Sequence, residues 1–123
     1  MKSVIGTVFL IASVFIAFMA QAHAEDIKFH ILNESPYDIQ VRFFSKARTV
    51  FWPGQHSGYD QKDHVVHDYS LACNPGEQIC YGAWTMPHLA DKWGVGDTGK
   101  LGCAKCCGVC GQNVSEISLG LAK

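Results

Sequence analysis

Four cysteines crowded into eight residues constrain the fold of this chain more than any other feature of its sequence. Residues 103–110 read CAKCCGVC, which is two CxxC units placed back to back, and two further cysteines lie upstream at Cys73 and Cys80. Two sulfurs at CxxC spacing can converge on one point, the arrangement used by zinc ribbons and by thiol redox sites. The chemistry of these cysteines therefore depends on whether their compartment is reducing or oxidising.

The N-terminal segment has the composition of an export signal. Lys2 supplies a positive charge, residues 4–20 are almost wholly apolar, and residues 22–24 read AHA before charge returns at Glu25. This order predicts a signal peptide over residues 1–24 and a single cysteine-rich domain over residues 25–123. An uncleaved anchor is the alternative, but the apolar stretch is at the short limit for a membrane-spanning helix. We expect no stable membrane anchor after cleavage and a periplasmic or secreted domain.

Export favours disulfides for the six cysteines, because an even number of cysteines in a small exported domain is typically oxidised. Many pairings are open, although neighbouring cysteines bond poorly to each other. We expect Cys73 and Cys80 to bond separately to the 103–110 segment. That arrangement would clamp the long irregular stretch of residues 82–111 onto a hairpin. The predicted disulfide cysteines are Cys73, Cys80, Cys103, Cys106, Cys107 and Cys110.

Two alternatives remain open for the cysteine cluster. The first is a metal–thiolate site that binds zinc or copper, since soft thiolate ligands select Zn(II) and Cu(I). Its ligands would be Cys103, Cys106, Cys107 and Cys110. The second is a thiol–disulfide oxidoreductase, although such sites usually place one CxxC at a helix N-terminus, and no helix is expected here. The leading hypothesis, disulfides alone, needs no cofactor.

The remaining sequence alternates apolar and polar residues with a period of two, which predicts strands. Strands are expected over residues 27–31, 37–43, 49–52, 64–73, 78–84 and 114–119. Pro75-Gly76 predicts a tight turn that pairs residues 64–73 with residues 78–84 as a hairpin. No segment shows convincing helical periodicity. The sequence therefore predicts an all-β fold, a small disulfide-rich β-sandwich or a partly open barrel.

The residue types present favour binding over catalysis. No Ser-His-Asp triad, carboxylate pair or cysteine-protease signature can be assembled. Residues 25–123 carry nine Lys and Arg against eleven Asp and Glu, a formal charge of −2 with no basic stripe, so nucleic acid is not an expected partner. Five aromatic residues could line a peptide or glycan groove, or could cap the core instead. They are Trp52, Tyr59, Tyr81, Trp84 and Trp93.

A histidine pair in an acidic run is the other candidate metal site. His64 and His67 lie among Asp60, Asp63 and Asp68. On a strand, the odd spacing of the two histidines points their side chains to opposite faces. We therefore expect no shared metal ion.

Three motifs together resemble a group of small exported, cysteine-rich bacterial proteins of unknown function. They are ICYGAW at residues 79–84, WGVG at residues 93–96 and CxxCCxxC at residues 103–110. The resemblance covers most of the domain and implies export and a cysteine-bound β fold. It brings no catalytic residues with it. The function expected from the sequence is a binding or structural role, with an unknown protein, peptide or glycan as ligand.

Overall fold

The structure is a computed structural model that describes residues 25–121, and the signal peptide expected over residues 1–24 lies outside this range. The described part contains nine strands and no helix, so it has no helix that could cross a membrane. The strands are β1 (Glu25–Asn33), β2 (Asp38–Ser45), β3 (Phe51–Trp52), β4 (Tyr59–Gln61), β5 (His67–Cys73), β6 (Gln78–Met86), β7 (Lys92–Gly94), β8 (Cys107–Val109) and β9 (Ile117–Leu119).

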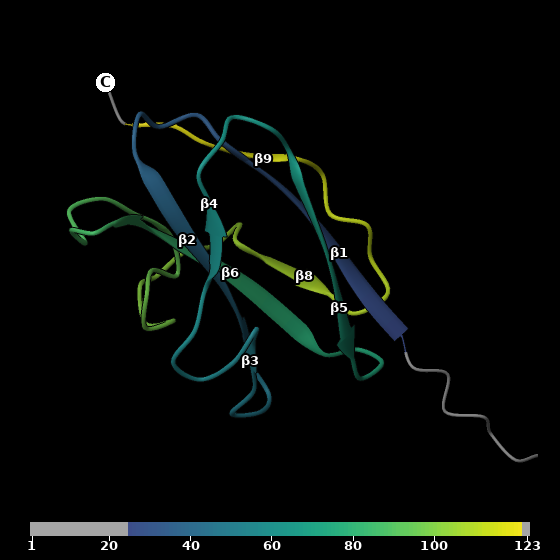
Figure 1. Ribbon diagram of the computed structural model, residues 1–123. Helices are drawn as coiled ribbons and strands as arrows, with labels where there is room; N and C mark the ends of the chain where they lie inside the picture. The colour runs from purple at the N-terminus through teal and green to yellow at the C-terminus, as the bar shows by residue number, and fades with distance from the viewer. Residues whose placement is uncertain (1–24, 122–123) are drawn as a thin grey trace, which may run out of the picture.

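The strands form two sheets, which confirms the predicted all-β sandwich. The first sheet has the order β5-β1-β9, with β5 antiparallel and β9 parallel to β1. The second has the order β3-β2-β6-β7, and the short strands β4 and β8 extend it by pairing with β2 and β6. Figure 1 shows β5 beside β1 in one layer, with β2 and β6 in the other. The sheets remain separate and do not close into a barrel.

The core lies between the sheets and follows from the alternation in β1 and β2. Phe29 of β1 and Phe43 of β2 are fully buried, with ring centroids 4.8 Å apart. Tyr59 and Tyr69 pack beside Phe43, with 4.8 Å between their own ring centroids. Each buried side chain of this size stabilises the fold by about 1.5–3 kcal/mol relative to an exposed one. The other fully buried aliphatic side chains of these two strands are Ile27, Ile31, Ile39 and Val41.

The ICYGAW motif lies in β6, which is buried on both faces. Its odd-numbered residues face the main core, whereas Cys80 packs on the opposite face with Phe44 and Val95. A Cβ atom on Gly82 would lie 1.9 Å from the Gly96 carbonyl oxygen, so no larger residue fits there. The loop after β7 therefore covers the outer face of β6 at close range.

The predicted hairpin between residues 64–73 and 78–84 is wrong. β5 pairs with β1, and β6 pairs with β2, so the turn at Pro75-Gly76 carries the chain from one sheet to the other. The physical reason is that both edges of β6 are already occupied, by β2 on one side and by β7 and β8 on the other. A strand that is apolar on both faces takes such a central position.

Candidate functional site

Two disulfides attach the end of the cysteine cluster to both layers of the sandwich. Cys80 of β6 bonds to Cys107 of β8, directly opposite, with Cα atoms 3.9 Å apart. Cys73, the last residue of β5, bonds to Cys110 with a Cα separation of 5.9 Å. The predicted clamp of the cluster by Cys73 and Cys80 is thus confirmed. It joins two sheets, however, and not the two strands of a hairpin.

The third disulfide links Cys103 to Cys106 within the cluster, so that no cysteine of residues 25–121 is free. The four cysteines of the alternative metal site are divided among three disulfides, and none presents a thiolate in this state. Across residues 25–121, no group of three or more His, Cys, Asp or Glu side chains is placed to hold a metal ion. The three disulfides agree with the predicted disulfide framework.

The two histidines of the acidic run are also kept apart. His64 Nδ1 lies 2.8 Å from the Asn33 carbonyl oxygen, and His67 Nε2 lies 2.7 Å from Asp63 Oδ1. The contact with His67 lowers the pKa of the Asp63 carboxyl. Each ring thus has its own local partner.

Glu77, which carries a buried carboxylate, lies in the sequence between the disulfide cysteines Cys73 and Cys80. The Glu77 side chain is 2 % exposed and accepts hydrogen bonds from Arg48 Nε at 2.5 Å and Nη2 at 2.6 Å, and from the Asn74 backbone N–H at 3.0 Å. The Ser45 hydroxyl donates to the same carboxylate at 2.5 Å. The Arg48 guanidinium is the main cause that lowers the pKa of Glu77 to about 2. The Glu77 backbone carbonyl also accepts from the Cys110 N–H at 2.8 Å, which joins the backbone at residue 77 to the Cys73–Cys110 disulfide.

The five aromatic residues of the expected groove do not gather on one surface. Tyr81 is buried in the main core, whereas Trp84 is buried on the opposite face of β6 beneath the Arg42 guanidinium, 5.2 Å from its ring centroid. The other three are partly buried and pack against the core edge, and Trp93 Nε1 donates to the Gly120 carbonyl at 2.9 Å. These three are Trp52, Tyr59 and Trp93. The aromatics therefore serve mainly as core and edge residues.

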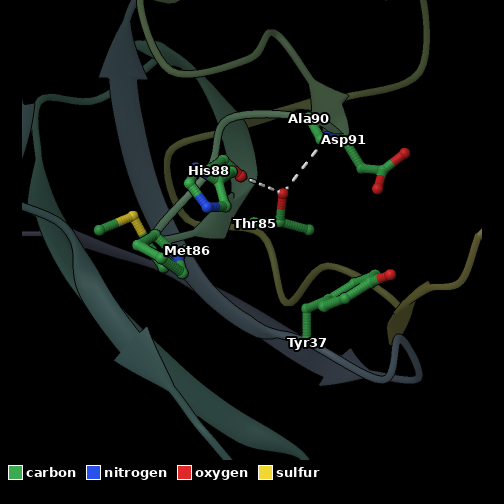
Figure 2. A pocket seen from close by; sticks show the side chains of 7 residues that line it. Tyr37, Thr85, Met86, His88, Ala90 and Asp91 are labelled. Atoms are coloured by element: carbon green, nitrogen blue, oxygen red, sulfur yellow. Dashed lines mark hydrogen bonds between the residues drawn. The ribbon is translucent and has the colours of Figure 1, made fainter.

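A pocket of about 310 Å³ lies at the end of β6, beside the loop that leads to β7 (Figure 2). Its lining is mostly apolar, and Asp91 supplies its one carboxylate. The lining residues are Tyr37, Thr85, Met86, Pro87, His88, Ala90 and Asp91. Sequence reasoning missed this pocket, since a short loop after a buried strand carries no motif and Tyr37 joins it only through the fold.

Thr85 fixes the shape of the pocket loop. Its hydroxyl donates to the His88 carbonyl at 2.6 Å and accepts from the Asp91 N–H at 3.2 Å, as Figure 2 shows. The Thr85 N–H also donates to the Asp91 carbonyl at 3.0 Å. Thr85 itself is buried, and its three hydrogen bonds tie His88 and Asp91 of the loop to the end of β6.

Replacing Thr85 by valine is expected to loosen this loop. Valine keeps the shape of the side chain but removes the hydroxyl, which leaves the partly buried Asp91 N–H without its acceptor at a cost of about 1 kcal/mol. Hydrogen exchange measured by NMR should then be faster at Asp91, with little change in the central strands. Thr85→Ser, which retains the hydroxyl, is the control. Equal exchange at Asp91 in the wild-type and valine proteins would show that the hydroxyl does not hold the loop.

The clamped sandwich thus carries a preformed, mostly apolar pocket with a single carboxylate. Its disulfides indicate an oxidising environment, in agreement with the cysteine count. Comparisons of the chain with protein-family models, with curated proteins and with solved structures find no match, so its function is inferred from these residues alone.

Proposed function

We propose that this chain is an exported, non-catalytic binding domain, periplasmic or secreted, whose pocket beside the 87–91 loop takes a basic side chain of a peptide or protein together with an apolar neighbour. The observation that carries the proposal is a preformed apolar pocket with Asp91 at its wall. The disulfides support a binding role as well. The Cys73–Cys110 and Cys80–Cys107 bonds join both layers of the framework that carries the pocket.

The size of the pocket suits a small part of a larger ligand. About 310 Å³ lies at the lower end of the range for ligand pockets, roughly 300–1,000 Å³. Tyr37, which lines the pocket, is 51 % exposed, and Leu89, in the loop beside it, is 48 % exposed, so a bound peptide would meet apolar side chains on both sides of the loop. A peptide segment that inserts one or two side chains fits this combination.

The charges around the pocket favour a basic ligand. The Asp91 carboxylate accepts no hydrogen bond and forms no ion pair with the described residues, so it is available to a ligand. A neighbouring depression, also lined by Met86 and Pro87, adds Asp38 and Asp60 against one cation, Lys62. A lysine or arginine side chain can lay its aliphatic stem on the apolar wall while its charge meets Asp91.

Two capped dipeptides of opposite charge test the proposal. Acetyl-Leu-Lys-amide and acetyl-Leu-Glu-amide share the leucine and differ only in the second side chain. In NMR titrations of the disulfide-bonded protein, the lysine peptide is expected to shift the amide signals of residues 86–91 and to bind at least several-fold more tightly. In Asp91→Asn, which has nearly the same shape, that preference should disappear.

Either of two results would count against the proposal. Unchanged signals for residues 86–91 with both peptides would remove the pocket as a peptide site. Equal binding of the two peptides by the wild-type protein would leave an apolar site with no role for Asp91. Asp26→Asn serves as the matched control, because Asp26 accepts a hydrogen bond from the Ser70 hydroxyl at 3.2 Å and lines neither the pocket nor the neighbouring depression.

A further inference from the structure

The outer edge of β5 is the longest unpaired strand edge in residues 25–121. β5 has seven residues and pairs only with β1, beside which it lies in Figure 1. The other strands that border the sheets have two or three residues each. Proteins commonly protect exposed edges by keeping the strands short, so β5 is the exception in this fold.

The hydrogen bonds of β1 show which backbone groups of β5 point outward. The Lys28 N–H donates to the Gln112 carbonyl at 3.0 Å, and the Lys28 carbonyl accepts from the Val114 N–H at 2.8 Å. The Asp26 carbonyl likewise accepts from the Gly111 N–H at 3.1 Å. Even-numbered residues of β1 therefore direct their backbone groups away from β5. Since these groups alternate along a strand, the odd-numbered residues make the bonds to β5.

The register between β1 and β5 shows which residues of β5 receive these bonds and which point outward. Ile27, Phe29 and Ile31 lie opposite the odd-numbered residues of β5. The N–H and C=O groups of the even-numbered residues of β5 must then face the open edge. These residues are Asp68, Ser70 and Ala72, and all three are exposed. Their backbone groups make no turn or loop hydrogen bond with the rest of the described chain.

Nothing in β5 blocks another strand from pairing with this edge. Residues 67–73 contain no proline, lysine or arginine, and their register with β1 runs without a bulge. The one acidic side chain, Asp68, is held against His30, whose Nδ1 lies 2.5 Å from Asp68 Oδ1. The three outward N–H and C=O pairs are thus a ready template for a further strand.

We propose that β5 pairs antiparallel with β5 of a second copy of this chain, in the register centred on Ser70. In this register Ser70 faces its own equivalent and Asp68 faces Ala72 of the second copy, so that all three outward residues find partners. Tyr69 then lies opposite Leu71 on the core side, an apolar cross-strand pair. Shifting the register to centre on Asp68 would bring two carboxylates together, which is unfavourable. The edge is therefore complementary to itself, and the dimer carries one continuous six-stranded sheet.

Sedimentation equilibrium of the disulfide-bonded protein tests the dimer, with Ser70→Lys as the disrupting variant. Lysine leaves the backbone of β5 unchanged but places two like charges face to face in the paired strands. We expect the wild-type protein to dimerise reversibly and Ser70→Lys to raise the dissociation constant at least tenfold. The matched control is Ser118→Lys, an exposed residue of β9 in the same sheet. It should dimerise like the wild-type protein.

Hydrogen exchange identifies the interface independently. The amides of Asp68, Ser70 and Ala72 should become protected as the protein concentration rises. A wild-type protein that stays monomeric up to millimolar concentration would overturn the proposal, as would a dimer in which these amides stay unprotected. Protection by an added extended peptide, with no homodimer at any concentration, would assign the edge to a different occupant and would also overturn it.

Discussion

Replacing Cys73 and Cys110 together by alanine is expected to lower the free energy of unfolding by roughly 3 kcal/mol. The two clamps jointly close a loop of about a dozen residues, 73–80 and 107–110, and cutting one clamp opens that loop in the unfolded chain. Removing Cys80 and Cys107 should have a similar effect for the same reason. Urea denaturation followed by tryptophan fluorescence measures both variants.

The third disulfide supplies the matched control. Cys103 and Cys106 are three residues apart, so their bond closes a much shorter loop and removes less entropy from the unfolded chain, about 2 kcal/mol at most.

Removing all four clamp cysteines should leave residues 103–110 attached to neither sheet. With a total stability of about 5–15 kcal/mol for a typical domain, that variant should be largely unfolded at 37 °C. If the Cys103/Cys106 variant proved the least stable of the pairs, the clamp assignment would be contradicted.

The longer strands were predictable from local alternation, whereas the short strands β4, β7 and β8 lie outside the expected ranges. The clamp was predictable from the oxidising compartment and from the need to hold a long irregular stretch in place. Ile27, Phe29 and Ile31 alternate with polar residues, which predicts a strand with one buried face. The burial of β1 and β2 shows this alternation. The turn at Pro75-Gly76 was also predictable, but its consequence was not. A tight turn can join paired strands or carry the chain between sheets. The deciding factor was that both edges of β6 are occupied, by β2 on one side and by β7 and β8 on the other, strands that lie far from the turn in the sequence.

The pocket and the free edge could not be predicted, because both arise from pairing. Thr85 is one threonine in an apolar run until the loop folds back onto its hydroxyl. Tyr37 meets Met86 at the pocket only because β2 and β6 are neighbours in register. The outward direction of the Ser70 backbone follows from bonds on the far side of β1. None of these contacts is marked by a periodic pattern of apolar and polar residues in the sequence.

Glu77 should give the protein a distinct loss of stability in acid. Its carboxyl has a pKa of about 2 in the folded protein, lowered from 4.5 chiefly by Arg48. Because the folded pKa is the lower one, the contribution is fully present above pH 4.5 and is lost as the pH falls toward 2. Arg48 is 39 % exposed, and solvent screening reduces the effect to roughly 2 kcal/mol.

Glu77→Gln isolates this contribution from those of other carboxyl groups. Glutamine nearly preserves the shape of the side chain but does not ionise, so the variant should be less stable near pH 7 and should lose less stability between pH 5 and 2. Asp63 and Asp97, whose pKa values are also lowered, titrate in both proteins and cancel in the comparison. Arg48→Met should move the acid transition to higher pH, since the Glu77 pKa then returns toward 4.5. Parallel stability curves for the wild-type and glutamine proteins would mean that Glu77 is not the group that responds to acid.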